Sequence, residues 1–96
     1  MEKSKRISCI LKEMNEVDSK LSKLEMKYKS LKAIKSTRYM NITANVKKEE
    51  KYSHISFNLE EDFIQAVYQT LHNCYQEKIQ ENLKKLGELQ ETLKNL

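Results

Sequence analysis

The spacing of apolar residues near the start of the chain constrains its fold more than any other feature. Apolar side chains recur from Ile7 to Leu31 at alternating steps of three and four residues, without a miss. This spacing keeps them on one face of a helix, and a run of four heptads is typical of a left-handed coiled coil. We therefore expect a helix over residues 5–35 that pairs with another helix. The predicted seam consists of Ile7, Ile10, Met14, Val17, Leu21, Leu24, Tyr28 and Leu31.

The apolar period changes from helical to alternating after Arg38. Two runs rich in β-formers follow, and each places apolar residues on one side and polar residues on the other, as a half-buried strand does. Four or five charged and polar residues around Glu49 and Glu50 separate the runs, without the Asn-Gly or Asp-Gly that fixes a turn type. This pattern predicts a β-hairpin over residues 38–57. Its apolar side carries Met40, Ile42, Ala44, Val46, Ser53, Ile55 and Phe57.

A second helix is predicted over residues 59–95. Asn58 is a candidate N-cap, and Glu61 three residues later completes a capping box. Neighbouring acidic residues place negative charge in the first turn, where the helix dipole favours it. The apolar stripe that follows includes the seam positions Leu71, Ile79, Leu86 and Leu93. Its other members are Ile64, Val67, Tyr68, Tyr75, Leu83, Leu89 and Leu96.

Three positions of the second helix depart from a regular seam. The spacing drifts near Tyr75, which predicts a local break in supercoiling. Asn82 falls where an apolar residue is expected, so it either sets the register as a buried polar group or is exposed, with Leu83 in its place. Gly87 costs roughly 1 kcal/mol relative to Ala inside a helix, which suggests either close packing or fraying.

The fold class that follows is mainly α, with the 96 residues in a single domain. The two helices match in length, and a hairpin between them returns the chain, so we expect an antiparallel coiled coil. A pair of helices and a two-stranded ribbon are each marginal alone, and the ribbon leaves unpaired edges. We therefore expect a homo-oligomer.

The sequence predicts no enzyme, no cofactor and no metal site. It has no Gly-rich phosphate loop, no nucleophile with a locatable base and no paired metal-ligand motif. Cys9 and Cys74 lack metal-binding or disulfide-framework spacing, which favours a reducing compartment. No apolar run has the length of a signal peptide or a membrane span. We expect a cytoplasmic protein without membrane contact, in the host cytoplasm if a phage encodes it.

Two surfaces are candidates for binding. Residues 1–38 carry a net charge of +6, so nucleic acid is a possible partner of the basic first helix, although a solvent-exposed face of mixed charge is the alternative. The polar side of the hairpin combines aromatic, amide, hydroxyl and basic groups that suit a protein or a small anion such as a nucleotide. The alternatives there are a solvent-exposed face chosen for β propensity, or a face buried in the oligomer. The candidate residues are Arg38, Tyr39, Asn41, Thr43, Tyr52 and His54.

The order helix, hairpin, helix resembles the β-type subunit of prefoldin. That resemblance implies assembly through the strands and a holdase chaperone whose coil tips bind unfolded clients. The small size, the richness in Lys, Glu, Asn and Ile and the lack of Pro look like early proteins of phages, some of which inhibit host defence. The function expected first is therefore a non-catalytic interaction module that inhibits or sequesters a host factor or nucleotide signal, with a holdase or a nucleic-acid-binding protein as alternatives.

Overall fold

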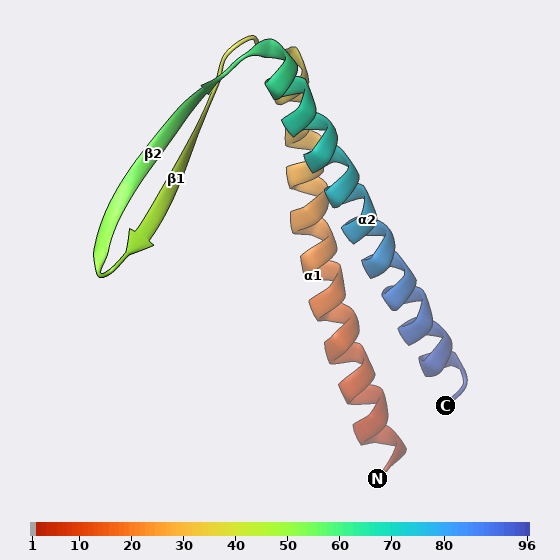
Figure 1. The fold of residues 1–96 in the computed structure, drawn as a ribbon. Helices are drawn as coiled ribbons and strands as arrows, with labels where there is room; N and C mark the ends of the chain where they lie inside the picture. The colour runs from red at the N-terminus through yellow and green to blue at the C-terminus, as the bar shows by residue number, and fades with distance from the viewer. Residues whose placement is uncertain (1) are drawn as a thin grey trace.

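A computed structural model describes residues 2–96, which form two long helices joined by a two-stranded antiparallel hairpin (Figure 1). Helix α1 spans Lys3–Ser36 and helix α2 spans Glu61–Lys94. Strand β1, Met40–Lys48, pairs with strand β2, Lys51–Leu59. The predicted mainly helical class with a hairpin between two helices is confirmed. The elements differ from the predicted ranges by one or two residues at each end.

The two helices lie side by side and antiparallel, with both chain ends far from the hairpin (Figure 1). Over residues 2–31, the side chains withdrawn from solvent are those of the predicted seam, from Ile7 to Leu31, and all others are exposed. Heptad spacing thus identified the packed face of α1. Left-handed supercoiling, and the break expected near Tyr75, stay predictions.

The core between the helices is thin. The buried apolar side chains among the described residues are Val17, Leu21, Leu31 and Ile64, and only Ile64 is completely hidden from solvent. Full burial of such a side chain contributes roughly 1.5–3 kcal/mol. The rest of the seam is half-buried, so α1 and α2 cover each other on one side only.

The irregular positions of α2 are now resolved. Asn82 is buried with 8% of its surface exposed, whereas Leu83 is 44% exposed, so the polar residue occupies the seam. The Asn82 side-chain amide donates a hydrogen bond of 2.8 Å to the Lys78 carbonyl of its own helix. A Cβ built on Gly87 would meet nothing within 4 Å, so close packing does not explain this glycine, and α2 continues past it.

The turn of the hairpin is tighter than predicted, because the strands pair further toward it. Pairing runs from Met40 opposite Leu59 to Lys48 opposite Lys51, so only Glu49 and Glu50 form the turn. Both have positive φ, 50° and 66°. A two-residue type I′ turn requires positive φ at both positions because its twist matches that of the strands. The expected loop of four or five residues is therefore wrong: strand pairing imposes left-handed backbone on two glutamates.

The predicted capping box at Asn58 is also wrong. Glu60 is the N-cap of α2 and makes no side-chain capping bond. Asn58 instead belongs to β2, opposite Asn41. Its side-chain oxygen accepts hydrogen bonds from the Asn41 amide at 2.7 Å and from the Tyr39 hydroxyl at 3.2 Å. Cross-strand partners thus outcompete the helix end, while Glu61 and Asp62 still place acid in the first turn as expected.

All four elements lie in a single layer. The Cα positions extend over 57 × 38 × 14 Å, and neither strand packs on a helix within the described residues, so no element covers another pair. The hairpin leaves the end of the helix pair at an angle and projects into solvent (Figure 1). Within residues 2–96, extensive packing joins α1 to α2 and β1 to β2, but neither strand to a helix. The hairpin is therefore an arm with both faces open.

Candidate interaction surface

The polar face of the hairpin carries most of the predicted binding residues, and they bond to one another. The Thr43 hydroxyl lies 3.1 Å from the Ser56 hydroxyl and 3.2 Å from the Asn41 side-chain oxygen. His54 bonds to Asn45 directly across the strands. A ladder of cross-strand side-chain bonds thus runs along this face. Cross-strand pairs of this kind contribute roughly 0.2–1 kcal/mol each to a sheet.

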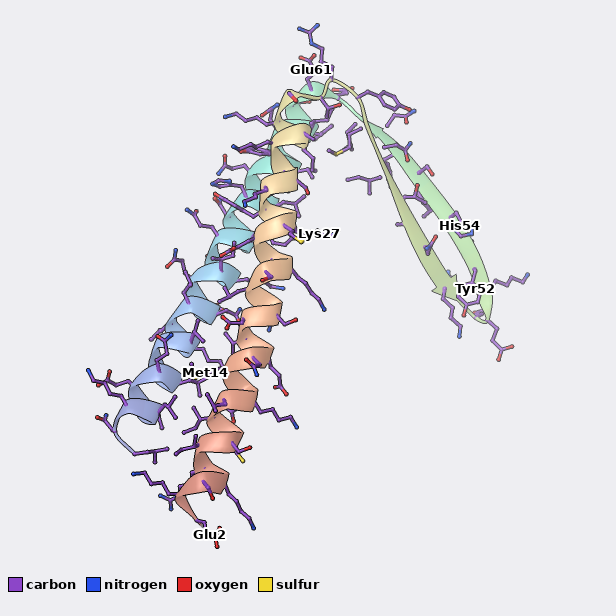
Figure 2. All side chains as sticks on the ribbon, turned by 180° about the vertical axis from the view of Figure 1, so that it is seen from behind. Glu2, Met14, Lys27, Tyr52, His54 and Glu61 are labelled. Atoms are coloured by element: carbon purple, nitrogen blue, oxygen red, sulfur yellow. The ribbon has the colours of Figure 1, made fainter. Side chains whose placement is uncertain are left out.

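The structure places the six predicted residues at different distances from the helices. Tyr39, Asn41 and Thr43 share one hydrogen-bonded group near the base of the hairpin, through Asn58. His54 and Tyr52 lie nearer the tip (Figure 2), where the Lys47 ammonium sits 5.5 Å from the Tyr52 ring centre. Arg38 precedes β1 and is exposed. The six do not converge on one pocket, and their role in binding stays a prediction.

The opposite face of the hairpin is apolar and uncovered. Ile42 pairs with Phe57 and Ala44 with Ile55, so their side chains share one face. The exposed fractions are 39% for Ile42, 41% for Val46, 43% for Ile55 and 56% for Phe57. Contiguous exposed apolar surface of this kind on a small protein marks an interaction site. The sequence identified the face as apolar, but we expected it to be covered and did not count it among the candidate sites.

Two lysines end the apolar face at the tip of the hairpin. Lys48 and Lys51 are opposite each other in the register, two residues beyond Val46 and Ser53, so they point to the same side as the apolar residues. Like charges directly opposite in a sheet destabilise it. The pair therefore costs the isolated hairpin stability. We define the apolar arm face as Met40, Ile42, Ala44, Val46, Ser53, Ile55, Phe57 and Leu59 with this lysine pair at its tip.

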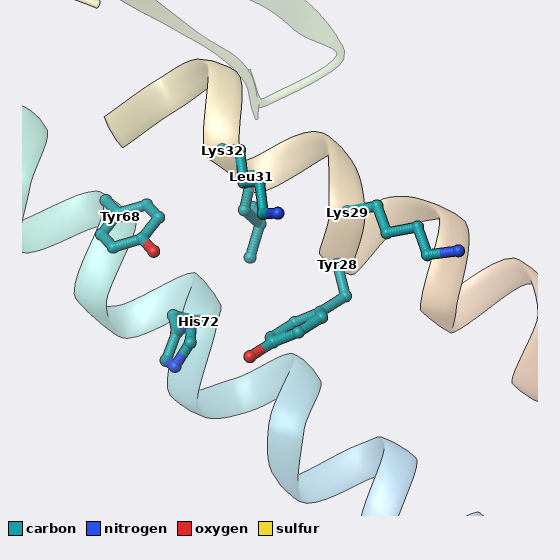
Figure 3. Close-up of a pocket in the computed structure, with 6 residues that line it drawn as sticks. All are labelled: Tyr28, Lys29, Leu31, Lys32, Tyr68 and His72. Carbon is teal, nitrogen blue, oxygen red and sulfur yellow. The ribbon is translucent and has the colours of Figure 1, made fainter. Parts of the chain in front are cut away.

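An aromatic cluster fills the helix pair near the base of the hairpin. Tyr28 of α1 and His72 and Tyr68 of α2 point toward one another (Figure 3), with ring centres 5.2 Å apart for Tyr28 and His72 and 5.7 Å for Tyr68 and His72. The adjoining cleft of about 270 Å³, with Leu31 on its wall, falls below the roughly 300–1,000 Å³ of typical ligand sites. We interpret the cluster as a packing layer. From the sequence, His72 was expected in mid-helix with a solvent-exposed or hydrogen-bonding role; its place in this layer was not predicted, because only apolar residues were counted in the stripe.

The free ends of the helices expose little apolar surface. Ile7 and Ile10 at one end and Leu93 and Leu96 at the other are half-buried on the inner side of the pair. Leu11, one residue beyond Ile10, is 45% exposed. A holdase function of the coil tips stays a prediction.

The described residues form neither a metal-binding cluster nor a membrane-spanning helix. No group of three or more His, Cys, Asp or Glu in residues 2–96 is placed to hold a metal ion. Neither helix contains an apolar stretch long enough to cross a bilayer.

The chain matches no protein-family model, no curated protein and no solved structure.

Proposed function

We propose that this protein is a non-catalytic interaction module in which the helix pair is a scaffold and the hairpin is the binding arm. The helices use their apolar stripes on each other, as in a coiled coil, and hold the arm clear of themselves. The apolar arm face then docks onto another protein surface. The observation that carries the proposal is that Ile42, Val46, Ile55 and Phe57 are all exposed on one face.

The polar face leads to a narrower proposal. Its exposed hydroxyl, amide and ring groups lie opposite the docking face, so they stay accessible when that face is covered. We propose that the polar face binds a target such as an anionic signal or a host protein. Binding of this kind would inhibit or sequester that target. Replacing Arg38, Tyr39, Tyr52 and His54 with Ala together is expected to abolish target binding while the far-ultraviolet circular dichroism stays unchanged.

Site-specific photo-crosslinking in cells tests the main proposal. A benzophenone amino acid replaces Ile55 on the apolar arm face, and in a matched control it replaces Thr43 on the polar face of the same hairpin. After irradiation of cells that express the full chain, we expect a discrete adduct at position 55 and much less of that adduct at position 43. The same adduct in equal yield at both positions, or no adduct at position 55, would contradict the proposal, whereas an adduct of different mass at position 43 would belong to a partner of the polar face.

A further inference from the structure

Too much surface is exposed for a folded chain of this mass. The described residues expose 8065 Å², whereas a compact monomer of 11.4 kDa exposes about 5,800 Å². The radius of gyration is 19.8 Å, against about 12–13 Å for a compact domain of this length. Domains are normally built from two packed layers, and this chain supplies one. A second layer must come from outside the chain.

The hairpin arm of a second copy has the right size to form the second layer over the apolar arm face. A two-stranded ribbon becomes stable when another sheet or further strands cover its apolar face. Two sheets pack face to face about 10 Å apart, with their side chains interdigitating. Another copy offers a face of the same length and twist. We infer that two copies of this chain pack their apolar arm faces together, with the tip of each hairpin against the base of the other; this rests on the proposed function.

The shape of the apolar face selects this antiparallel orientation. Bulk is greatest at the base, where Ile42 pairs with Phe57 next to Met40 and Leu59, and it falls toward Val46 and Ser53. Tip-to-base stacking places the small side chains at the tip of one arm against the bulky side chains at the base of the other, so the layer between them has an even thickness. Tip-to-tip stacking would bring the bulky bases together and leave a gap at the tips, and unfilled space between apolar side chains is costly.

Charge selects the same orientation independently. The tip places Lys48 and Lys51 on the apolar arm face, and with Lys47 and the turn residues Glu49 and Glu50 its net charge is +1. The base carries Glu60, Glu61 and Asp62 where β2 passes into α2, and Arg38 before β1 leaves it a net charge of −2; Figure 2 shows Glu61 at the opposite end of the hairpin from Tyr52. In a two-fold dimer the lysine pair of each copy meets the acidic base of the other, twice. Tip-to-tip stacking would instead set one lysine pair against the other and lose the contact with the acidic base.

The expected affinity is modest because the face is small. Two arm faces bury less than the roughly 1,600 Å² of a standard interface, so we expect dissociation constants in the micromolar range. Charge reversal tests the orientation: Lys48→Glu with Lys51→Glu keeps the like-charge pair within the hairpin but opposes acid to the acidic base. We expect about tenfold weaker dimerisation at low salt, and a smaller loss at high salt.

Adding Glu60→Lys and Glu61→Lys to that variant is expected to restore the affinity to within about threefold of wild type, because the interaction is reversed rather than removed. A control with Lys84→Glu and Lys94→Glu changes the net charge equally, far from the arm, and keeps wild-type association. Analytical ultracentrifugation of the full chain gives each constant. Wild-type affinity in the Lys48→Glu, Lys51→Glu variant, or no rescue, overturns the orientation. If position 55 instead crosslinks a different protein and the purified chain stays monomeric, the proposed function stands and this inference falls.

Discussion

The helix pair and the hairpin arm differ in how far they bury their apolar side chains. Between the helices, Val17, Leu21, Leu31 and Ile64 are at most 6% exposed. On the arm, four of the six large apolar side chains of one face, Ile42, Val46, Ile55 and Phe57, are 39–56% exposed. Both regions show a regular apolar period in the sequence, yet only the helices find a partner within the chain.

The difference shows that a regular spacing of apolar residues identifies which face of an element is apolar, but not what packs against that face. The helices are long enough to reach each other after the chain reverses, so their stripes meet. The hairpin provides that reversal and projects away, so its own face is left open (Figure 1). The helix pair thus buries its apolar stripes within the chain, whereas the apolar arm face stays uncovered, and we propose that another molecule covers it.

The largest expected effect comes from the helix core. Leu21→Ala should lower the free energy of unfolding by about 2–4 kcal/mol, because it removes buried contacts and leaves a cavity. In the matched arm variant, Ile55→Ala, the loss should be small in dilute solution and grow with protein concentration, since mass action links it to dimerisation. Chemical denaturation at two concentrations separates these cases. A concentration-independent loss in Ile55→Ala would erase the contrast between the regions.

The buried asparagine of the seam should respond in the opposite direction. Asn82→Leu is expected to raise the free energy of unfolding by about 1–2 kcal/mol, because the Asn82 amide bonds only its own helix and an apolar side chain suits the seam better. Thermal denaturation followed by circular dichroism measures the gain. A destabilised Asn82→Leu variant would show that the asparagine makes a contact across the helix pair.

The turn of the arm should be improvable by about 1 kcal/mol. Glu49→Asn with Glu50→Gly keeps the two-residue turn but supplies residues that tolerate positive φ. Amide hydrogen exchange of β1 and β2 should slow, while the exchange of α1 stays as in wild type. Unchanged exchange in the strands would indicate that the two glutamates are not strained there.

The smallest expected gain is at Gly87. Its Cβ position is open, so Gly87→Ala should add about 0.5–1 kcal/mol of helix stability with no steric penalty. Thermal denaturation checks this value, with the exposed Gln90→Ala as a control of nearly neutral effect. A loss of stability at position 87 would place another surface against that side of α2.

Periodicity predicted the helices, the hairpin and the sides of each element from residues alone. It failed where a residue had two possible partners. Asn58 fits an N-cap, but Asn41 and Tyr39 hold its side chain in the strand ladder, and the register that pairs Asn41 with Asn58 leaves only two residues for the turn. Such competition depends on the strand register, which no local motif reveals.

The candidate surface was predicted only in part. Alternation separated Thr43 from Ala44 and His54 from Ile55 correctly, so both faces were identified. Which face lacks a cover could not be known, since that depends on the angle at which the arm leaves the helices. The useful signal was the seam itself. Helices that bury their apolar stripes against each other have no further apolar surface with which to cover a hairpin.

The most direct test of the account is the mass of the chain in solution as a function of concentration. Sedimentation equilibrium from about 1 to 300 µM brackets the micromolar affinity expected. We predict that wild type rises toward twice its 11.4 kDa, that Phe57→Asp stays at one chain mass with its helices intact, and that Ser56→Asp on the opposite face behaves as wild type. A wild-type mass of one chain throughout, or a Phe57→Asp variant that still dimerises, would contradict it.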